Sequence, residues 1–260
     1  MEPAAKRPRA EEPAQAPAPA ADLSSGAIFL KDLDTDGAPS EELKSLLANL
    51  VLGPKGTYRC TPLVKTADGL KPFYFVAPPL PLAFGLSIYT APDAKQSLNA
   101  QMRIDASSTN GGIWARTVAA YEKRMLELFF DVRRKYLGLP NEATIDEIRG
   151  MFKRSIGITK HDREAMEEAG PTAKEPLPQH SLKIPLQKSN GMNIPKIPIC
   201  DRKGLPVPFP SVGGNCTVGA IIDPYVYFFG AMTGFGWEVK QMIVLDGINY
   251  ASQFIPGLYQ

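Results

Sequence analysis

Apolar residues along the chain follow two periods, and each period predicts a different kind of element. Between Ile113 and Tyr136 they recur every three or four positions, which is the period of one helix face. A glycine pair precedes this run and Gly138 follows it. The run predicts one long helix with a buried face of Ile113, Trp114, Val118, Tyr121, Met125, Leu128, Val132 and Tyr136.

Two shorter helices are expected on either side of the long one. Ser40 is a suitable N-cap for a leucine stripe that ends before Gly53. Downstream, "TIDE" from Thr144 is a capping box. The buried face of this second helix is expected to carry Ile145, Ile148, Phe152 and Ile156. We expect both stripes to pack against the main body.

Alternating or short apolar runs predict strands elsewhere. "TYRCTPLVKT" and "KPFYFVA" flank a turn at Asp68-Gly69, and "FGLSIY" and "AQMRID" follow. Strands return from Ser181 with "SLKIPLQ" and "NCTVGAIID". The last predicted strands form an aromatic hairpin around the turn in "YVYFFGAMTGFGWEVKQ".

The order of these elements predicts an α+β fold. It fits a small closed β-barrel, OB-fold-like, with a two-helix insertion at 113–157, and a two-sheet sandwich is the alternative. We expect residues 1–27 to form a disordered Ala/Pro-rich tail and 28–56 a partly helical extension. The barrel domain is expected over 57–260, with a mobile acidic, Pro-rich linker at 159–180.

Charge is distributed unevenly although the net charge is only +2. Segment 51–160 has 16 basic and 9 acidic residues, and segment 181–260 has 6 and 4. Segment 1–50 has 5 basic and 9 acidic residues, and segment 161–180 has 2 and 5. A basic body with acidic appendages fits a polyanion-binding protein, although charges can also scatter in this way by chance.

The cysteines and the apolar runs bear on compartment and class. Three widely spaced cysteines, Cys60, Cys200 and Cys216, are expected to be reduced thiols of an intracellular protein. No apolar run approaches membrane-spanning length, so we expect no membrane association.

Enzyme chemistry finds little support. The two histidines, His161 and His180, both fall in the predicted linker, and no cluster has metal-ligand spacing. We therefore expect a protein that is not an enzyme and has no cofactor or metal. A carboxylate-only site would require strand-end residues such as Asp105, Asp201 and Asp223 to converge.

Basic and aromatic residues are interleaved along the predicted strands. Single-stranded nucleic acid is bound by this combination, because cations follow the phosphates and planar rings stack on unpaired bases. The candidate binding residues are Arg59, Lys65, Lys71, Phe73, Tyr74, Arg103, Lys183, Tyr227, Trp237 and Lys240.

Alternation separates the core rings from the exposed ones. Phe73 and Phe75 share one face and are expected inside, which leaves Tyr74 as the exposed ring. Apolar residues on both faces of its strand place Trp237 in the core rather than on a stacking platform. The rings to test first on DNA are then Tyr74 and Tyr227.

A short basic motif, Lys6, Arg7 and Arg9 in "KRPR", lies in the predicted disordered tail. Clustered basic residues in an exposed tail can be recognised by a nuclear import receptor. We expect a nuclear protein, in the host nucleus if the source is a virus.

The segment "NCTVGAIIDPYVYFFGAMTGFGWEVKQMIV" resembles the closing part of the phage-like single-stranded DNA-binding proteins of large DNA viruses. Phe235, Gly236, Trp237, Val239 and Gln241 fill a similar pattern with shortened spacing, and "HSLKIPLQ" is similar to the preceding strand. The resemblance covers about the last third of the chain.

The resemblance implies an oligonucleotide-binding barrel that coats single strands during replication, recombination or repair and contacts replication proteins. Many such proteins end in an acidic tail, whereas this chain has no acid after Asp246. We expect single-stranded DNA as the partner, and homo-oligomerisation stays open. The alternative is a β-rich structural or interaction protein, and it gains if Arg59, Lys65, Lys71 and Arg103 do not converge on one groove.

Overall fold

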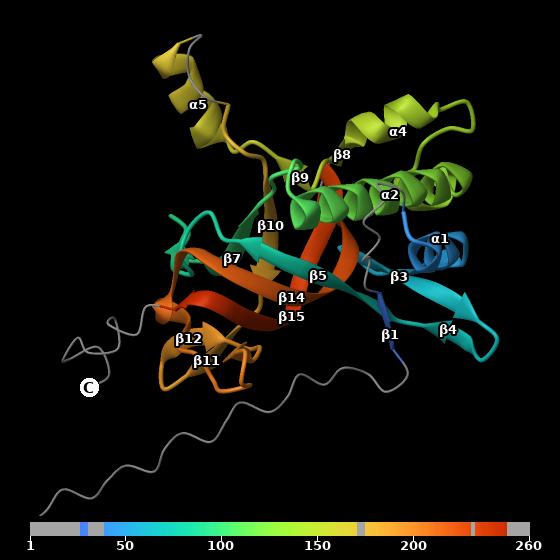
Figure 1. The fold of residues 1–260 in the computed structure, drawn as a ribbon. Helices are drawn as coiled ribbons and strands as arrows, with labels where there is room; N and C mark the ends of the chain where they lie inside the picture. Colours follow the sequence, from blue (N-terminus) through green and yellow to red (C-terminus); the bar gives the residue numbers. More distant parts are fainter. Residues whose placement is uncertain (1–26, 31–38, 171–174, 230–231, 249–260) are drawn as a thin grey trace, which may run out of the picture.

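The structure is a computed structural model that describes residues 27–30, 39–170, 175–229 and 232–248 (Figure 1). The predicted import motif therefore lies outside the described residues. The helices are α1 (Glu41–Ala48), α2 (Thr109–Asp131), α3 (Arg133–Leu137), α4 (Ile145–Met151) and α5 (Lys160–Ala169), with a 3-10 turn at Phe209–Ser211. The strands are β1 (Ile28–Leu30), β2 (Leu50–Lys55), β3 (Arg59–Thr66), β4 (Gly69–Lys71), β5 (Phe73–Pro81), β6 (Ile88–Thr90), β7 (Gln96–Arg103), β8 (Phe152–Lys153), β9 (Ile156–Gly157), β10 (Gln179–Ile184), β11 (Leu186–Ser189), β12 (Met192–Pro195), β13 (Ile199–Asp201), β14 (Val212–Phe229) and β15 (Met232–Ile248).

The α+β composition is confirmed, with most of the described strands in one mixed sheet. Its main path runs β1-β5-β14-β15-β10-β7-β6, and β3 also pairs with β14. This path is open, so within the described residues the strand ladders do not form the closed barrel expected from the sequence. The shortest strand pairing on this path is between β15 and β10, which are in register at one residue pair, Lys183 with Glu238.

The N-termini of two helices follow the predicted caps, whereas α1 ends at Ala48 and Gly53, the expected end of its leucine stripe, lies in β2. The Ser40 hydroxyl accepts a hydrogen bond from the Leu43 amide at the start of α1, and Thr144 and Glu147 form the predicted capping box of α4. The predicted long helix is split at Val132 into α2 and α3. A second difference is that Ile156 lies in β9 and not on the helix before it.

Helix α2 lies across one side of the sheet (Figure 1), and the two enclose an aromatic core. The ring centroids of Tyr121 and Trp237 are 5.2 Å apart, and Phe75 lies 5.4 Å from Tyr121. Trp114 packs against the same cluster and donates its indole hydrogen to Nδ1 of His180 at 2.9 Å. These contacts attach α2 to β5, β10 and β15.

The prediction that residues 159–180 form a linker is wrong at its C-terminal end, because His180 is fully buried in β10. Burial disfavours the charged imidazolium and lowers the pKa of His180 to about 3. The N-terminal part is ordered too, since α5 is capped by Thr159 and projects from the body with no buried residue (Figure 1).

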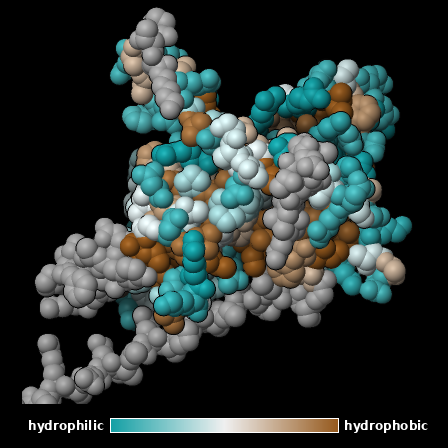
Figure 2. Space-filling model, in the orientation of Figure 1, coloured by the Kyte–Doolittle hydropathy of each residue, from teal (hydrophilic) through white to brown (hydrophobic). Residues whose placement is uncertain are grey.

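Hydrophobic residues are gathered over the strands in the lower half of the face shown in Figure 2, whereas hydrophilic residues cover α5 at the top left. None of the described helices is long and apolar enough to cross a bilayer.

Candidate nucleic-acid interface

Strands β14 and β15 form a long antiparallel hairpin whose two faces differ. The register is continuous from Ile222 opposite Val239 to the hairpin end, so side chains alternate strictly between the faces. The inward residues Ile222, Val226, Phe235, Trp237 and Val239 are buried. The outward positions carry Tyr225 and Tyr227 on β14, opposite Gly236 and Gly234 on β15.

Each of these tyrosine rings lies directly over the glycine opposite it. A Cβ at Gly236 would lie 2.1 Å from Cζ of Tyr225, and a Cβ at Gly234 would lie 2.3 Å from Oη of Tyr227. Any other residue at 234 or 236 would displace the ring above it. The two glycines therefore let the tyrosines lie close against the sheet.

The flanking strands place charges beside the tyrosines. On β3, Arg59 is paired with Tyr227, and on the other side β8 places Lys153 beside Gly234. The Arg59 guanidinium lies 4.0 Å from the centroid of the Tyr225 ring, within cation–π distance. Tyr225 is thus covered by Arg59, whereas Tyr227 has no such cover among the described contacts.

An ion-pair network lies next to Tyr225. Arg59 contacts Asp223 at 2.9 Å and Glu238 at 3.4 Å. Lys240 contacts Asp223 at 3.2 Å and Glu238 at 2.7 Å. Both cations predicted here are therefore compensated by carboxylates that the sequence argument did not assign to the site.

Ionisation of the network follows from competition between burial and charge. Burial raises the pKa of Glu238, but the hydrogen bond from Lys240 and the charges of Lys240, Arg59 and Lys183 outweigh it, so the net pKa is below its usual value. Burial lowers the pKa of Lys240, but Glu238 and Asp223 more than reverse this. Both groups are accordingly charged at neutral pH, which keeps the network intact.

Further cations line a small cavity of about 240 Å³ beside the tyrosines. Lys153, Arg154 and Lys183 border it together with Tyr225 and Tyr227, and all three cations are exposed. The outward face thus combines five cations, Arg59, Lys153, Arg154, Lys183 and Lys240, with the two carboxylates of the network. We call this surface the tyrosine groove; it is positively charged and contains a ring, Tyr227, that is only partly buried.

Three predicted binding rings are buried and cannot stack on bases in this conformation. Phe73 and Trp237 are 2% exposed and belong to the aromatic core, as the alternation indicated. The expectation that Tyr74 is exposed is wrong, because its exposure is only 7%. Strand β1 pairs with β5 and places Phe29 against Tyr74, with ring centroids 5.6 Å apart.

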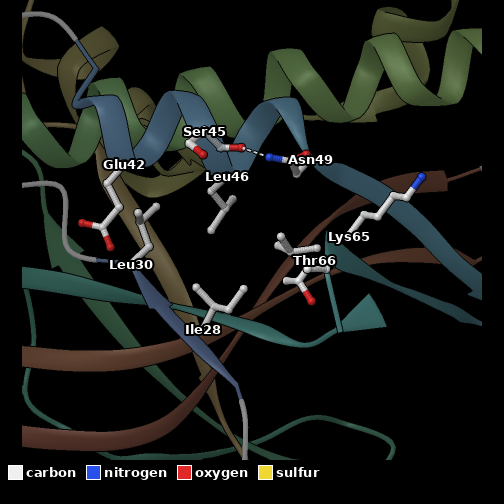
Figure 3. A pocket seen from close by; sticks show the side chains of 10 residues that line it. Ile28, Leu30, Glu42, Ser45, Leu46, Asn49, Lys65 and Thr66 are labelled. Carbon is white, nitrogen blue, oxygen red and sulfur yellow. Dashed lines mark hydrogen bonds between the residues drawn. The ribbon is translucent and has the colours of Figure 1, made fainter. Parts of the chain in front are cut away.

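Arg59, Lys65, Lys71 and Arg103, whose convergence on one groove would favour nucleic-acid binding, do not converge. Lys65 borders a separate cavity of about 650 Å³ between α1, β1 and β3, where it extends away from Ile28 and Leu30 (Figure 3). Lys71 is paired with Asp68 at the β3–β4 turn. Arg103 donates to the Asn215 side chain on another part of β14. Only Arg59 lies in the tyrosine groove.

Sequence reasoning missed Lys153 and Arg154, because the predicted helix runs through both residues as far as Ile156. The roles of Gly234 and Gly236 were also missed. One signal was available: tyrosines two residues apart, followed by glycines two residues apart, are the pattern of an antiparallel pair in which rings cover glycines.

The three carboxylates considered for catalysis have local roles. Asp105 accepts hydrogen bonds from Ser107 before α2, and Asp201 accepts from the backbone of Lys203 and Leu205 in a turn. Asp223 is held by Arg59 and Lys240. In the part of the chain that the structure describes, no group of three or more His, Cys, Asp or Glu side chains is placed to hold a metal ion.

The chain resembles solved structures of phage single-stranded DNA-binding proteins, which is the family that the sequence resemblance indicated. The protein of bacteriophage Enc34 in complex with ssDNA is 11% identical, with a TM-score of 0.37, and the match covers 77% of this chain and 98% of that chain. The gp2.5 protein of bacteriophage T7 is 8% identical, with a TM-score of 0.42 and coverage of 70% and 96%. No family model and no curated protein sequence matches the chain.

Proposed function

We propose that this protein binds single-stranded DNA without sequence preference through the tyrosine groove. One observation carries the proposal: the Tyr227 ring lies over Gly234 beside the exposed Lys153, Arg154 and Lys183. A ring held against the sheet is preorganised for stacking, and the neighbouring cations are within reach of the phosphates. The matched phage proteins are named for binding single-stranded DNA, but the proposal rests on the groove.

The groove chemistry favours a role without base-specific contacts. Stacking on an aromatic ring tolerates every base, and each stacked base contributes about 1–3 kcal/mol. We propose that the protein coats unpaired strands in replication, recombination or repair, that it is viral, and that it acts without catalysing a reaction.

An OB-like arrangement is part of the proposal. The backbone amide of Ala83 donates to the Gln101 carbonyl at 2.7 Å, and Leu82 forms an isolated bridge with Met102. These contacts bring the end of β5 onto β7. We propose an OB-like order of strands β5, β14, β15, β10 and β7 without a closed strand ladder, with the tyrosine groove on the outward side.

The test is a fluorescence-anisotropy titration of labelled oligo-dT at several salt concentrations. We expect affinity to fall with salt, with a log–log slope of about −0.7 per phosphate contacted. Tyr227→Ala should weaken binding by about 5-fold to 150-fold, whereas Tyr227→Phe keeps the ring and should bind like the wild type. Salt-independent or undetectable binding by the wild type would overturn the proposal.

A matched control comes from β6, the last strand on the main path of the sheet, three strands away from β15. Tyr89 on β6 is 62% exposed, so Tyr89→Ala removes a comparable ring from a surface outside the groove. This variant should bind oligo-dT like the wild type. Equal losses in Tyr89→Ala and Tyr227→Ala would mean that the groove is not the binding surface.

The alternative, a structural or interaction protein, is favoured by one observation. Of the four cations whose convergence would favour binding, Lys65, Lys71 and Arg103 lie apart from the groove, which favours that alternative. It predicts a homo-oligomer or a complex that forms without nucleic acid. Light scattering of the purified protein with and without oligo-dT separates the two, because a DNA-binding protein should change mass on adding oligo-dT.

Nuclear entry is proposed through Lys6, Arg7 and Arg9. A fluorescent reporter fused to residues 1–27 should accumulate in the nucleus, and replacing the three basic residues by alanine should abolish this. Equal distribution of both reporters would refute the proposal.

A further inference from the structure

The outward side of β14 carries a third aromatic residue beyond the two tyrosines. Tyr225, Tyr227 and Phe229 occupy alternate positions of one strand, in a stretch with unbroken register, so they share a face. Phe229 is 64% exposed, which is among the highest exposures of the large hydrophobic residues described. Phe228, between them, points inward and packs 6.0 Å from the Phe129 ring.

The end of this strand is joined to a second exposed ring on another hairpin. Tyr58, in the β2–β3 turn, is 66% exposed. Its carbonyl accepts a hydrogen bond from the Phe228 amide at 3.0 Å, so the β2–β3 turn lies against the end of β14. We call the surface formed by Tyr58, Phe229, Lys55 and the basic residues of α3 the hairpin tip.

Basic residues reach this tip from α3. Lys55, in β2, lies 4.7 Å from the Phe228 centroid and donates to the Tyr136 carbonyl at 2.5 Å. This bond places α3 next to the β2–β3 turn. Arg134 and Lys135 on α3 are exposed, and within the described residues neither forms a salt bridge; Asp131, just before α3, is an exposed acid at the same end.

We infer that the bound strand continues past Tyr227 onto the hairpin tip, where Phe229 and Tyr58 stack on nucleotides and Arg134 and Lys135 hold phosphates. The inference rests on the proposed function and adds a second segment to the binding site. Isolated exposed rings are common on protein surfaces. Two rings at joined turns beside uncompensated cations have the composition of a single-strand site rather than an apolar protein interface, which is depleted in lysine.

Strand geometry sets the size of the added segment. Alternate residues of a β-strand are about 6.8 Å apart, and stacked nucleotides of one DNA strand advance by about 3.4 Å. The step from Tyr227 to Phe229 therefore corresponds to about two stacked nucleotides. Tyr58 and α3 extend the segment further, so the tip should affect only oligonucleotides long enough to reach it.

The test is a length series of oligo-dT from about 4 to about 30 nucleotides, titrated against the wild type and the variant Tyr58→Ala/Phe229→Ala. The two rings are exposed, so we expect the variant to fold, and circular dichroism checks this. Affinity for the longest oligonucleotides should fall about 10-fold or more, while the shortest that binds measurably at Tyr227 should change less than about 2-fold. Arg134→Gln/Lys135→Gln should make the salt slope on long oligonucleotides shallower by about 1.4.

The matched control is Phe84→Ala/Tyr89→Ala, which removes two rings of similar exposure, 55% and 62%, from the connection between β5 and β7. It should leave the whole length series unchanged. If Tyr227→Ala weakens binding but the tip variant follows the wild type at every length, the tip inference is wrong and the groove proposal stands.

Two further outcomes are informative. If the tip variant alters the mass measured by light scattering without altering DNA affinity, the tip is a protein interface and the inference is overturned. If the wild type itself does not bind oligo-dT, the proposed function fails, and the inference fails with it.

Ultraviolet cross-linking to oligo-dT with peptide mapping adds an independent readout. Cross-links at Tyr58 or Phe229 are expected. Their absence alongside cross-links at Tyr227 would contradict the inference.

Discussion

Strands β5 and β14 carry similar aromatic patterns, yet their rings are in opposite environments. On β5, Phe73 and Phe75 face α2, and Tyr74 on the other side is covered by Phe29 of β1. On β14, Tyr225 and Tyr227 face glycines across the hairpin and charged side chains of the neighbouring strands. The exposure of a ring is thus decided by the neighbouring strand and helix, not by the alternation of its own strand.

The difference in environment gives the aromatic residues of β5 and β14 two different roles. The β5 rings stabilise the fold by apolar burial and by edge contacts to Tyr121 and Trp237. The outward β14 rings contribute less to the core: Tyr227 is only partly buried, and Tyr225 is covered by Arg59. Substitutions should therefore change the free energy of unfolding on β5 and the affinity for DNA on β14.

The largest expected effect is on the buried strand. Phe75→Ala removes a ring that is fully buried, and we expect a loss of about 3–5 kcal/mol in the free energy of unfolding. Urea denaturation measures it. Phe229→Ala on β14 is the control and should stay within about 0.5 kcal/mol of the wild type. Similar losses in both would remove the contrast between the strands.

Lowering the pH should reduce the free energy of unfolding through the buried His180. The pKa of His180 is about 3 in the folded protein, below the ordinary histidine value of 6.5, so between these values only the unfolded chain binds the proton. The stabilisation is complete above pH 6.5 and decreases as pH falls, by about 1.4 kcal/mol per pH unit and about 2 kcal/mol by pH 5.

The variant His180→Asn isolates this contribution, because it removes the titrating group while retaining a side chain that can accept the Trp114 hydrogen bond. It should be less stable at pH 7 but should lack the wild-type slope between pH 6.5 and pH 5 in urea denaturation. Parallel slopes in the two proteins would show that His180 is not the titrating group.

The glycines under the tyrosines give the next effect. Gly236→Ala should displace the Tyr225 ring, at a cost of about 1–3 kcal/mol in unfolding free energy. Gly213→Ala, on β14, is the matched control, since a Cβ there meets nothing within 4 Å. Adding Tyr225→Ala to Gly236→Ala should cost less than the sum of the two single changes, because the clash is gone. Strict additivity would argue against the contact.

The smallest effect concerns the cover over Tyr74. Phe29→Ala should destabilise the protein by about 1 kcal/mol and leave oligo-dT affinity unchanged, because Tyr74 is not part of the tyrosine groove. Anisotropy and urea titrations of the same preparation measure both. Binding weakened by more than about 5-fold would instead extend the DNA-binding surface to β1.

Local patterns predicted most elements of this fold. The leucine stripe after Ser40, the capping box at Thr144 and the burial of Phe73, Phe75 and Trp237 all depend on residues close in sequence, where period and cap chemistry are decisive. The helix break at Val132 was not visible, since the apolar period continues through it.

Contacts between distant segments were not predictable in the same way. Tyr74 is buried because β1, over 40 residues earlier, pairs parallel to β5. His180 is buried because α2 places Trp114 beside β10. The cations of the groove come from β3, β8, β10, β15 and the residue after β8, and the pairing of these strands brings them together. The sequence around these residues gave no signal of these long-range pairings.

The close fit of each tyrosine over a glycine also has an evolutionary consequence. Position 225 is tied to position 236, and position 227 to position 234, as cross-strand pairs. A lineage that acquires a side chain at either glycine can keep the pairing only if the opposite residue becomes smaller. Relatives of this protein should therefore show the two positions of each pair changing together, and such paired changes would identify the same hairpin in sequences too divergent to align elsewhere.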